Sequence, residues 1–550
     1  MPPHIDQPFS RRTLLGGAAA GAGGLVLAGD STALAKVARR RTRYARTPLA
    51  KGVKYGQGVS SGQPSTSGIT LWTRVEGVDR TSRLQVEVSP DEDFRRIVAR
   101  NDVLAEQARD FTIHTRVSRG LRPGEQYFYR FYTCMDENSQ VGRFRTARPS
   151  DSREPVRIGF FSCQEYDSGF YTAHAALARE ADLDLVIGLG DYIYERVFDR
   201  NPIRSDTTGA NRDGEVQTLP EYHQKYNLYN SDPNLIAMRA SHPMMAIWDD
   251  HEVEDNYARD KPGEATKQVR VPFLQRQRNG YDAFFNHMPR IRVKSDPDQI
   301  FGRIGLGGSA DVFLLDQRRF RDDQACGDEF AVPCGEQDDP GRTLLGADQK
   351  RWLLDGLAGS RATWKVIGNQ VMIMALDVPR GNPLNPDQWD GYAAERAELL
   401  NFIGDRGVKD VAFVTGDIHT FFTGNVSPTG RQSELRQPAS VATEFVGGSI
   451  TTKGIFDAAS GERGRDAAAL PSDESVYINN PHIRFSNQSV KGYGVLEASS
   501  EELRVAYRGV RTTQSPESEA FTLAEFRVAR GRPEVEVVRA PTAGPQPLPL

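Results

Sequence analysis

The sequence lacks an excess of charge of either sign. Its 550 residues carry 69 lysines and arginines against 73 aspartates and glutamates, a formal net charge of −4. Because binding to nucleic acid through bulk charge needs a basic surface, this balance gives no support for such a role. The sequence also has no internal repeats and no apolar run of the roughly 20 residues that a membrane span requires. We expect a monomer without a stable membrane span.

Cysteine is scarce, with four residues in the chain. Cys326 and Cys334 flank a short Gly- and Pro-containing loop, which predicts a local disulfide in an oxidising compartment. Cys134 follows a strand-like run and is interpreted as a buried thiol. Cys163 differs from these three because it lies in a polar cluster directly after an apolar run.

The N-terminus has the order of features expected for an export signal. Paired Arg11 and Arg12 precede a weakly apolar stretch at residues 16–28, and Ala33-Leu34-Ala35 provides small residues for cleavage. The pattern resembles a twin-arginine signal peptide over residues 1–35, and the competing interpretation is an arginine-rich tail. The resemblance implies the twin-arginine export machinery as a partner and a secreted, periplasmic or cell-envelope location.

The rest of the chain divides by its patterns of hydrophobicity. Residues 36–50 are basic and predict a linker, whereas residues 51–148 hold short alternating strands such as Leu84–Val88 and Tyr127–Tyr132. This pattern predicts a small all-β domain of the immunoglobulin or fibronectin kind. Residues 149–540 alternate strands with helices and predict an α/β domain of mixed sheets flanked by helices. The Pro-rich residues 541–550 predict a disordered tail.

Within the α/β domain, the runs expected to form buried strands are 156–161, 183–189, 243–248, 313–316, 364–368 and 411–415. Helices are expected at 173–180, 348–357 and 395–403, and the polar, Gly-rich stretch 201–221 predicts a long loop.

Four polar clusters follow such apolar runs: Ser162–Gln164, Gly190–Tyr194, Asp249–Glu252 and Gly416–His419. Because parallel strands place their carboxyl ends at one edge of a sheet, we expect these clusters to converge. Together they bring a thiolate, carboxylates, a phenolate and imidazoles into one cleft. That donor set predicts a metal site, and with a histidine free to move protons it predicts metal-assisted cleavage of phosphate esters.

Each cluster also has a plainer interpretation. Asp191 and Tyr194 are alternatively a helix cap and a packing aromatic. Asp417 and His419 are alternatively a helix N-cap and a lone imidazole. As ligands, being two residues apart, they would share one side of an extended segment and reach the same cleft. Cys163 is alternatively a nucleophile, although no base is recognisable near it in the sequence. His251 lies beside the candidate ligand Asp250 and is suited to donating a proton.

The clusters resemble the calcineurin-like metallophosphoesterase superfamily and, within it, the alkaline phosphatase D family. The segments that carry the resemblance run over most of the chain: Tyr55–Gly62, Leu71–Arg74, Ser162–Gln164, Gly190–Glu195, Trp248–Glu252, Asp387–Tyr392, Gly416–His419 and Asn480–His482. The resemblance implies a metallophosphoesterase sandwich of mixed sheets flanked by helices.

It also implies a site containing Fe(III) and Ca(II). By motif match, Cys163, Tyr194 and His419 would bind iron, and Asp191 would bridge the metals. Asp250 and Asp417 would replace nitrogen and amide ligands of relatives with carboxylates, which favours calcium. His251 matches the family's proton-donating histidine. Gln370 falls near the position of a further metal-binding histidine in relatives.

The resemblance therefore implies a secreted phosphoesterase that hydrolyses phosphate mono- and diesters by metal-activated hydroxide at alkaline pH. Two alternatives stay open. One is a phosphodiesterase or phospholipase D-like enzyme acting on phospholipids or cell-wall polymers. The other is a non-catalytic protein that binds a surface through the all-β domain.

Overall fold

The computed structural model describes residue 44 and residues 47–133, 137–199, 201–263, 266, 268–332, 334–378, 382–428, 439–454 and 473–540, the last segment without the side chains of 473–475. The expected signal peptide (1–35), most of the linker (36–50), Cys134 and the Pro-rich end (541–550) lie outside these residues. Among the residues described, no helix is both long enough and apolar enough to cross a bilayer.

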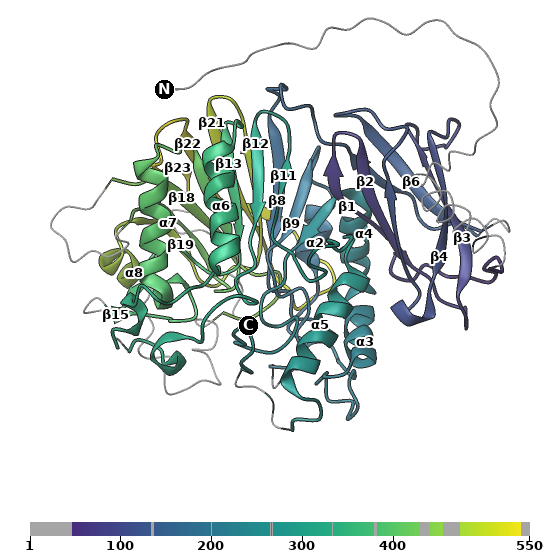
Figure 1. The fold of residues 1–550 in the computed structure, drawn as a ribbon, viewed down its shortest axis with the longest axis horizontal. Coiled ribbons are helices and arrows are strands. Elements are labelled where there is room, and N and C mark those ends of the chain that lie inside the picture. The colour runs from purple at the N-terminus through teal and green to yellow at the C-terminus, as the bar shows by residue number, and fades with distance from the viewer. Residues whose placement is uncertain are drawn as a thin grey trace, which may run out of the picture. The chain divides into compact units, whose positions relative to one another are not determined.

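The first seven strands form two antiparallel sheets of their own (Figure 1). One sheet contains β1 (Val59–Ser65), β2 (Gly68–Arg74) and β5 (Thr112–Val117). The other contains β3 (Ser82–Ser89), β4 (Ala99–Ala105), β6 (Gln126–Tyr132) and β7 (Gly142–Arg145). A short 3-10 helix, η1 (Gln107–Arg109), joins β4 to β5. Alternate residues of β6 and β7 are buried and contribute to a separate hydrophobic core, which is the arrangement that period-two strands require.

One residue of this sandwich connects it to the following helices. The Trp72 indole is fully buried, and its Nε1–H donates to the carbonyl of Asn286 at 2.9 Å. The guanidinium of Arg239 lies 4.3 Å above the same ring. Burying a tryptophan and stacking a cation on it make this contact a fixed part of the fold.

The rest of the chain builds two seven-stranded mixed sheets. The first has the order β10-β9-β8-β20-β21-β22-β23, with β8 (Val156–Phe161), β9 (Leu185–Gly188) and β10 (Met244–Ala246) parallel. The remaining strands are β20 (Gly492–Ala498), β21 (Glu502–Val510), β22 (Ala520–Ala529) and β23 (Glu536–Arg539). The second has the order β11-β12-β13-β16-β18-β17-β19, in which β12 (Ala310–Leu314), β13 (Trp364–Asn369), β16 (Val411–Thr415) and β18 (Ala442–Gly447) are parallel.

The strands β11 (Gly302–Gly305), β17 (Phe421–Val426) and β19 (Ile483–Asn487) complete the second sheet, and β14 (Asp377–Val378) pairs separately with β15 (Asn382–Pro383). The helices are α2 (Thr172–Leu177), α3 (Leu219–Asn230), α4 (Pro233–Ser241), α5 (Phe273–His287), α6 (Ala347–Gly359), α7 (Ala393–Asp405) and α8 (Asp473–Asn479). Three 3-10 turns accompany them: η2 (Ala325–Asp328), η3 (Glu336–Asp338) and η4 (Trp389–Tyr392).

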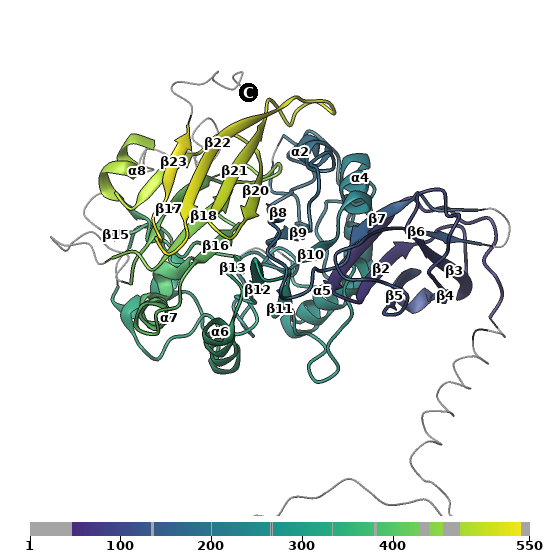
Figure 2. The same ribbon diagram turned by 90° about the horizontal axis from the view of Figure 1, so that it is seen from above.

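The two sheets face each other, with α6 and α7 covering the outer face of the second sheet (Figure 2). The alternation of side chains explains this layering. Val312, Val366 and Val414 belong to the core that contains the first sheet. Their chain neighbours Phe313 and Ile367 belong to the core formed with α6 and α7. Strands buried on both faces read as continuous apolar runs, as these do.

The expected α/β sandwich of mixed sheets preceded by an all-β part is confirmed. The expected loop at 201–221 is wrong at its end, because α3 begins at Leu219. Thr218 caps this helix, and its backbone N–H donates to the Glu221 side chain at 3.1 Å. A Thr three residues before a Glu, with a proline at the start of the helix, is a capping-box signature that the polar composition obscured. The helices α4 and α5 were also not predicted.

The close packing of β8 against β20 predicts that a larger residue at Gly494 destabilises the fold. Gly494 in β20 lies opposite Phe160 in β8, and a Cβ at Gly494 would overlap the Phe160 ring. We expect Gly494→Ala to lower the free energy of unfolding by about 1–3 kcal/mol, as overpacking of a core does. Gly302→Ala in β11 is the matched control, because a Cβ there meets nothing within 4 Å. Denaturant unfolding of both variants measures the difference, and equal midpoints would contradict the packing.

Candidate metal centre

The side chains expected to bind metal all lie just past the carboxyl ends of parallel strands. The loops after β8, β9 and β10 of one sheet and after β16 of the facing sheet supply them: Cys163, Asp191, Tyr194, Asp250, Asp417 and His419. Because the carboxyl ends of these strands lie at one edge of the two sheets, residues more than 200 positions apart meet there.

These side chains form three overlapping groups, in each of which one potential ligand atom per residue lies within 4.8 Å of the others. The groups are Cys163, Asp191 and His419; Asp191, Asp250 and His251; and Asp249, Asp250 and Asp417. Tyr194 joins the first group, since its hydroxyl lies 3.1 Å from Asp191 Oδ2 and 3.2 Å from His419 Nε2. Asp191 is shared by the first two groups, as a bridging ligand must be.

The backbone at these positions is unusual. Cys163, Asp191, Asp417 and His419 have φ values between +51° and +63°, the left-handed region that side chains other than glycine rarely adopt. The expectation that Asp417 and His419 share one side of an extended segment is therefore wrong. Both backbones turn instead, and the turns bring the two side chains into different groups. Each such residue costs about 1–2 kcal/mol, and such strain is concentrated at functional sites.

Burial favours the uncharged forms of the Cys163, Asp191, Tyr194 and His419 side chains. It raises the pKa of the Cys163 thiol, the Asp191 carboxyl and the Tyr194 phenol, and the nearby Asp191 raises the pKa of Cys163 and Tyr194 further. Burial lowers the pKa of His419 to about 3, so this imidazole is neutral and able to bind a metal. A cation in the site would reverse the first three effects, because metal binding requires deprotonated ligands.

The donor set fits a metal on a further ground. Three buried carboxylate oxygens here have no hydrogen-bond partner, namely Oδ1 of Asp191, Oδ1 of Asp250 and Oδ2 of Asp249. An unpartnered buried carboxylate oxygen is strongly unfavourable unless a cation neutralises it.

Glu252 holds two of the ligand loops together. Its fully buried carboxylate accepts hydrogen bonds from the backbone N–H groups of Tyr192 at 2.7 Å, Asp249 at 2.7 Å and Asp191 at 3.2 Å. Burial raises the pKa of Glu252 to about 8. One side chain thus fixes the position of the turn after β9 relative to the turn after β10, and with it the spacing of Asp191 and Asp250.

Arg318 provides an internal positive charge beside the carboxylates. Its guanidinium is fully buried, donates to both oxygens of Asp387 at 2.8 Å and contacts Asp249. The same guanidinium lies 3.4 Å from Asp417 and 3.6 Å from Asp250. Burial alone would lower the pKa of Arg318, but the surrounding carboxylates prevail and raise it. Arg318 follows strand β12 as the four clusters follow their strands, but no motif in the sequence predicts its role.

His251 is held by Glu195 on one side of the ring. Its Nδ1 lies 2.8 Å from Glu195 Oε2, and the ring stacks on Tyr194 with a centroid distance of 4.1 Å. Phe198 contacts the ring edge-on at 4.9 Å. Burial alone would lower the pKa of His251, but Asp250 and Glu195 prevail and raise it. One ring nitrogen of His251 also lies within 4.8 Å of a carboxylate oxygen of Asp191 and of one of Asp250.

Gln370 and His482 lie outside the three groups of candidate ligands. The amide nitrogen of Gln370 donates to the carbonyls of Trp248 at 2.9 Å and Leu315 at 2.8 Å, which leaves its buried Oε1 without a partner. His482 binds the carbonyl of Ala375 through Nε2 at 2.8 Å, and it belongs to none of the three groups.

Comparison with known proteins follows the same division of the chain. Residues 158–507 match the family model described as PhoD-like phosphatase, and residues 41–148 match the model described as PhoD-like phosphatase, N-terminal domain. Alkaline phosphatase D of Bacillus subtilis (strain 168) is 34% identical over 486 residues, which cover 85% of this chain and 80% of that protein.

Two solved structures support the fold. A structure of PhoD has a TM-score of 0.80 and 32% identity, covering 90% of this chain and 94% of that chain. A purple acid phosphatase from yellow lupin seeds, PPD1, has a TM-score of 0.50 at 14% identity, covering 87% of this chain and 75% of that chain, and shows a shared fold alone.

The resemblance inferred from the motifs is confirmed, and with it the prediction of an enzyme. The extent of these matches, together with a donor set that fits a metal cofactor, leads to one conclusion. The chain belongs to the PhoD-like phosphatase family and is a metal-dependent phosphoesterase.

Proposed function

We propose that this enzyme is an exported monomer that hydrolyses phosphate mono- and diesters at alkaline pH, with His251 as the general acid. The observation that carries the proposal is that Asp191 belongs to two groups of candidate metal ligands. It belongs both to the group with a thiol, a phenol and an imidazole and to the group with Asp250 and His251. That arrangement suits two adjacent cations of different chemistry, one of which lies beside a proton donor.

The first group suits Fe(III), and the second and third suit Ca(II). Cys163, Asp191, Tyr194 and His419 would hold iron, because thiolate and phenolate are anionic donors for a highly charged ion. Asp250 and Asp417 would hold calcium, which prefers carboxylate oxygens. When bound, the metals supply the Lewis acidity that activates water near neutral pH and neutralises the phosphate.

The chain's own residues supply the proton and its geometry. In the proposed step, His251 donates a proton from the nitrogen not bonded to Glu195 to the leaving oxygen. Glu195 accepts the Nδ1–H and therefore selects the tautomer and orientation of the ring. Tyr194 and Phe198 pack against the ring and restrict its rotation.

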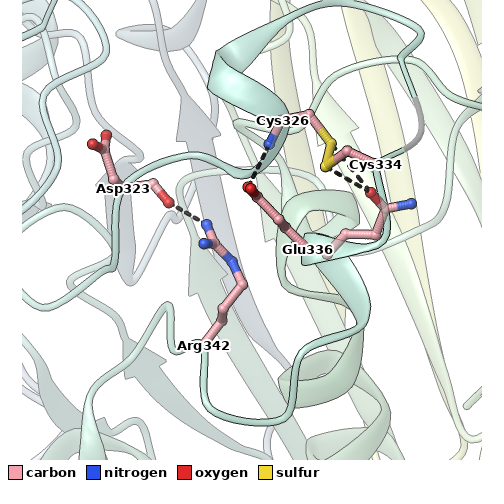
Figure 3. The surroundings of a disulfide bond; sticks show 6 residues. Asp323, Cys326, Cys334, Glu336 and Arg342 are labelled. Atoms are coloured by element: carbon pink, nitrogen blue, oxygen red, sulfur yellow. Dashed lines mark hydrogen bonds between the residues drawn. A yellow bond between two sulfur atoms is a disulfide. The ribbon is translucent and has the colours of Figure 1, made fainter.

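Export outside the cytoplasm is supported by the signal-like N-terminus and by a disulfide. Cys326 and Cys334 are bonded as the sequence predicted, with Cα atoms 5.5 Å apart (Figure 3). Beside the disulfide, the Cys326 N–H donates to Glu336 Oε2 at 2.9 Å, and Arg342 donates to the carbonyl of Asp323 (Figure 3). Disulfides persist in oxidising compartments and are rare in the cytosol.

The metal assignment predicts a coloured protein. Elemental analysis should find iron and calcium, and thiolate or phenolate bound to Fe(III) should give a visible charge-transfer band. Cys163→Ala combined with Tyr194→Phe should remove the band and the iron. Tyr192→Phe is the matched control, because Tyr192 lies in the same loop as Tyr194 but its hydroxyl donates to Asn230 at the end of α3. This substitution should leave the band and the iron unchanged.

Calcium removal provides the second half of this test. A calcium-selective chelator should abolish activity, and added calcium should restore it. A band that survives the double substitution would refute the iron ligands, and restoration by zinc alone would refute calcium.

The general acid is tested by its dependence on the leaving group. His251→Ala should lower kcat about 10²- to 10⁴-fold for alkyl phosphates while the protein retains its metals. The loss should be much smaller for nitrophenyl esters, whose leaving group needs no proton. Glu195→Ala should show the same pattern with smaller losses, because it acts through His251. Equal losses for both kinds of ester would exclude this role.

Activity and location are tested together by expressing the full chain and separating cell fractions. The exported, metal-replete enzyme should hydrolyse nitrophenyl phosphate, bis-nitrophenyl phosphate and a glycerophosphodiester, fastest at alkaline pH. Replacing Arg11 and Arg12 by lysine should leave the activity inside the cell. Turnover of diesters alone would favour the phosphodiesterase alternative, and turnover of none with metals bound would overturn the proposed substrates.

A further inference from the structure

A basic groove lies at the edge of the second sheet opposite the metal centre. It has a volume of about 1070 Å³ and is formed by the end of α6, the starts of β13 and β16, and the turns after β20 and β22. In Figure 2, α6 and α7 lie side by side on the face of the sheet that ends at this groove. Asp410 lines the groove, and the five residues of β16, at about 3.3 Å each, separate it by about 16 Å from the loop that holds Asp417.

The charges that line this groove have one sign. Six basic residues face it, accompanied by a single carboxylate, Asp410; the basic residues are Arg153, Arg361, Lys365, Arg406, Lys409 and Arg530. The groove thus carries a formal excess of five positive charges, in a chain whose formal net charge is −4. Gathering like charges around one concavity is unfavourable unless an anion compensates them.

Most of these cations have no acidic partner. Arg530 lies 4.0 Å from Asp410. Among the described residues, none of the other five forms an ion pair, whereas Arg318, Arg276 and Arg204 elsewhere each bind a carboxylate.

Among these cations, Lys365 gives the strongest support for an anion-binding site, because it is only 8% exposed. Its ammonium donates to the carbonyls of Thr363 at 3.2 Å and Lys409 at 3.1 Å, which uses two of its three N–H donors. Asp410 and Asp311 attract this charge from beyond ion-pair distance, but burial still prevails and lowers the pKa of Lys365. An anion in the groove that reached the remaining N–H donor would therefore stabilise the ammonium.

Helix electrostatics account for part of this pattern. Arg361 and Arg406 follow the C-terminal ends of α6 and α7, where positive charge stabilises the helix macrodipole. That explanation does not extend to Arg153 before β8, Lys365 in β13 or Arg530 after β22. Three separate segments thus add positive charge that the helices do not need.

The lining restricts what the anion is. No aromatic side chain lines the groove, so nothing is available to stack on nucleic-acid bases. No exposed large apolar side chain lines it either, so it offers nothing to insert into a lipid layer. The volume exceeds that of a single phosphate ion many times over. These features favour a flexible chain that carries several phosphate groups and no bases.

We propose that this groove is a docking site for a linear, phosphate-bearing polyanion, distinct from the metal centre. Several phosphates along the chain pair with the arginines and lysines, and Lys365 binds one of them at the floor. The proposal adds a binding site to the enzyme and does not depend on which phosphate esters the metal centre cleaves.

The test compares two triple variants of the metal-replete enzyme that change the net charge equally. The groove variant is Arg361→Gln, Arg406→Gln and Lys409→Gln. The control replaces three exposed arginines outside the groove that also lack a carboxylate partner among the described residues: Arg80→Gln, Arg119→Gln and Arg278→Gln. Binding of a long inorganic polyphosphate is measured by calorimetry over a range of salt concentrations, with nitrophenyl phosphate turnover as the check on the metal centre.

At about 0.1 M salt, the groove variant should bind polyphosphate at least about tenfold more weakly than the unmodified enzyme. The slope of log K against log salt should fall by about 2, at about 0.7 for each of three lost contacts with a flexible strand. The control should change binding by less than about twofold, and both variants should keep their turnover of nitrophenyl phosphate.

Three results would overturn the proposal. The first is equal weakening in both triple variants, which would mean that only bulk charge matters. The second is tighter binding of oligothymidylate than of polyphosphate of equal charge, which would indicate a nucleic-acid site. The third is binding of anionic phosphatidylglycerol vesicles without binding of polyphosphate, which would indicate a membrane surface.

Discussion

The structure depends on concentrating buried negative charge at one edge of two sheets. Asp191, Asp249 and Asp250 are each at most 2% exposed, and each has an oxygen without a hydrogen-bond partner. At separations of a few ångströms, unscreened carboxylates repel one another by several kcal/mol even at an effective dielectric constant near 20. Protonation and nearby cations both relieve this repulsion, since burial raises the pKa of Asp191 and Asp249 and the Arg318 guanidinium contacts Asp249. Bound metals would relieve it further.

A second set of carboxylates holds the backbone in the shape this charge requires. Glu252 accepts three N–H groups from the loops after β9 and β10. Glu444 in β18 acts similarly, since it accepts the N–H groups of Ile373 at 2.9 Å and Met374 at 2.7 Å and the Thr415 hydroxyl at 2.6 Å. Buried acceptors satisfied by several backbone donors fix loops that have no regular structure, which explains how left-handed positions such as Asp191 persist.

The layers of the fold and the candidate metal ligands could be predicted from the sequence. The residues that hold those ligands in place could not. Runs such as 411–415 are apolar on both faces, so they predict buried strands, and strand ends predict where the polar residues meet. Arg318 and Glu252 act through contacts with residues about 60 to 100 positions away, and no local pattern encodes such distances. The left-handed turns at Asp417 and His419 could not be predicted from the sequence either, because Asp and His do not require that backbone conformation.

The disulfide turn and the metal centre are physically connected, although they are separate in sequence. Asn256 donates its backbone N–H to Asp250 Oδ2 at 2.7 Å and its side-chain amide to Asp328 Oδ2 at 2.7 Å. Asp328 lies in η2, two residues from Cys326, where Cys326 and Asp328 both have positive φ. A disulfide that closes this turn stabilises it by restricting the unfolded chain. The Cys326–Cys334 bond therefore supports a turn that contacts, through one asparagine, a carboxylate proposed to bind calcium.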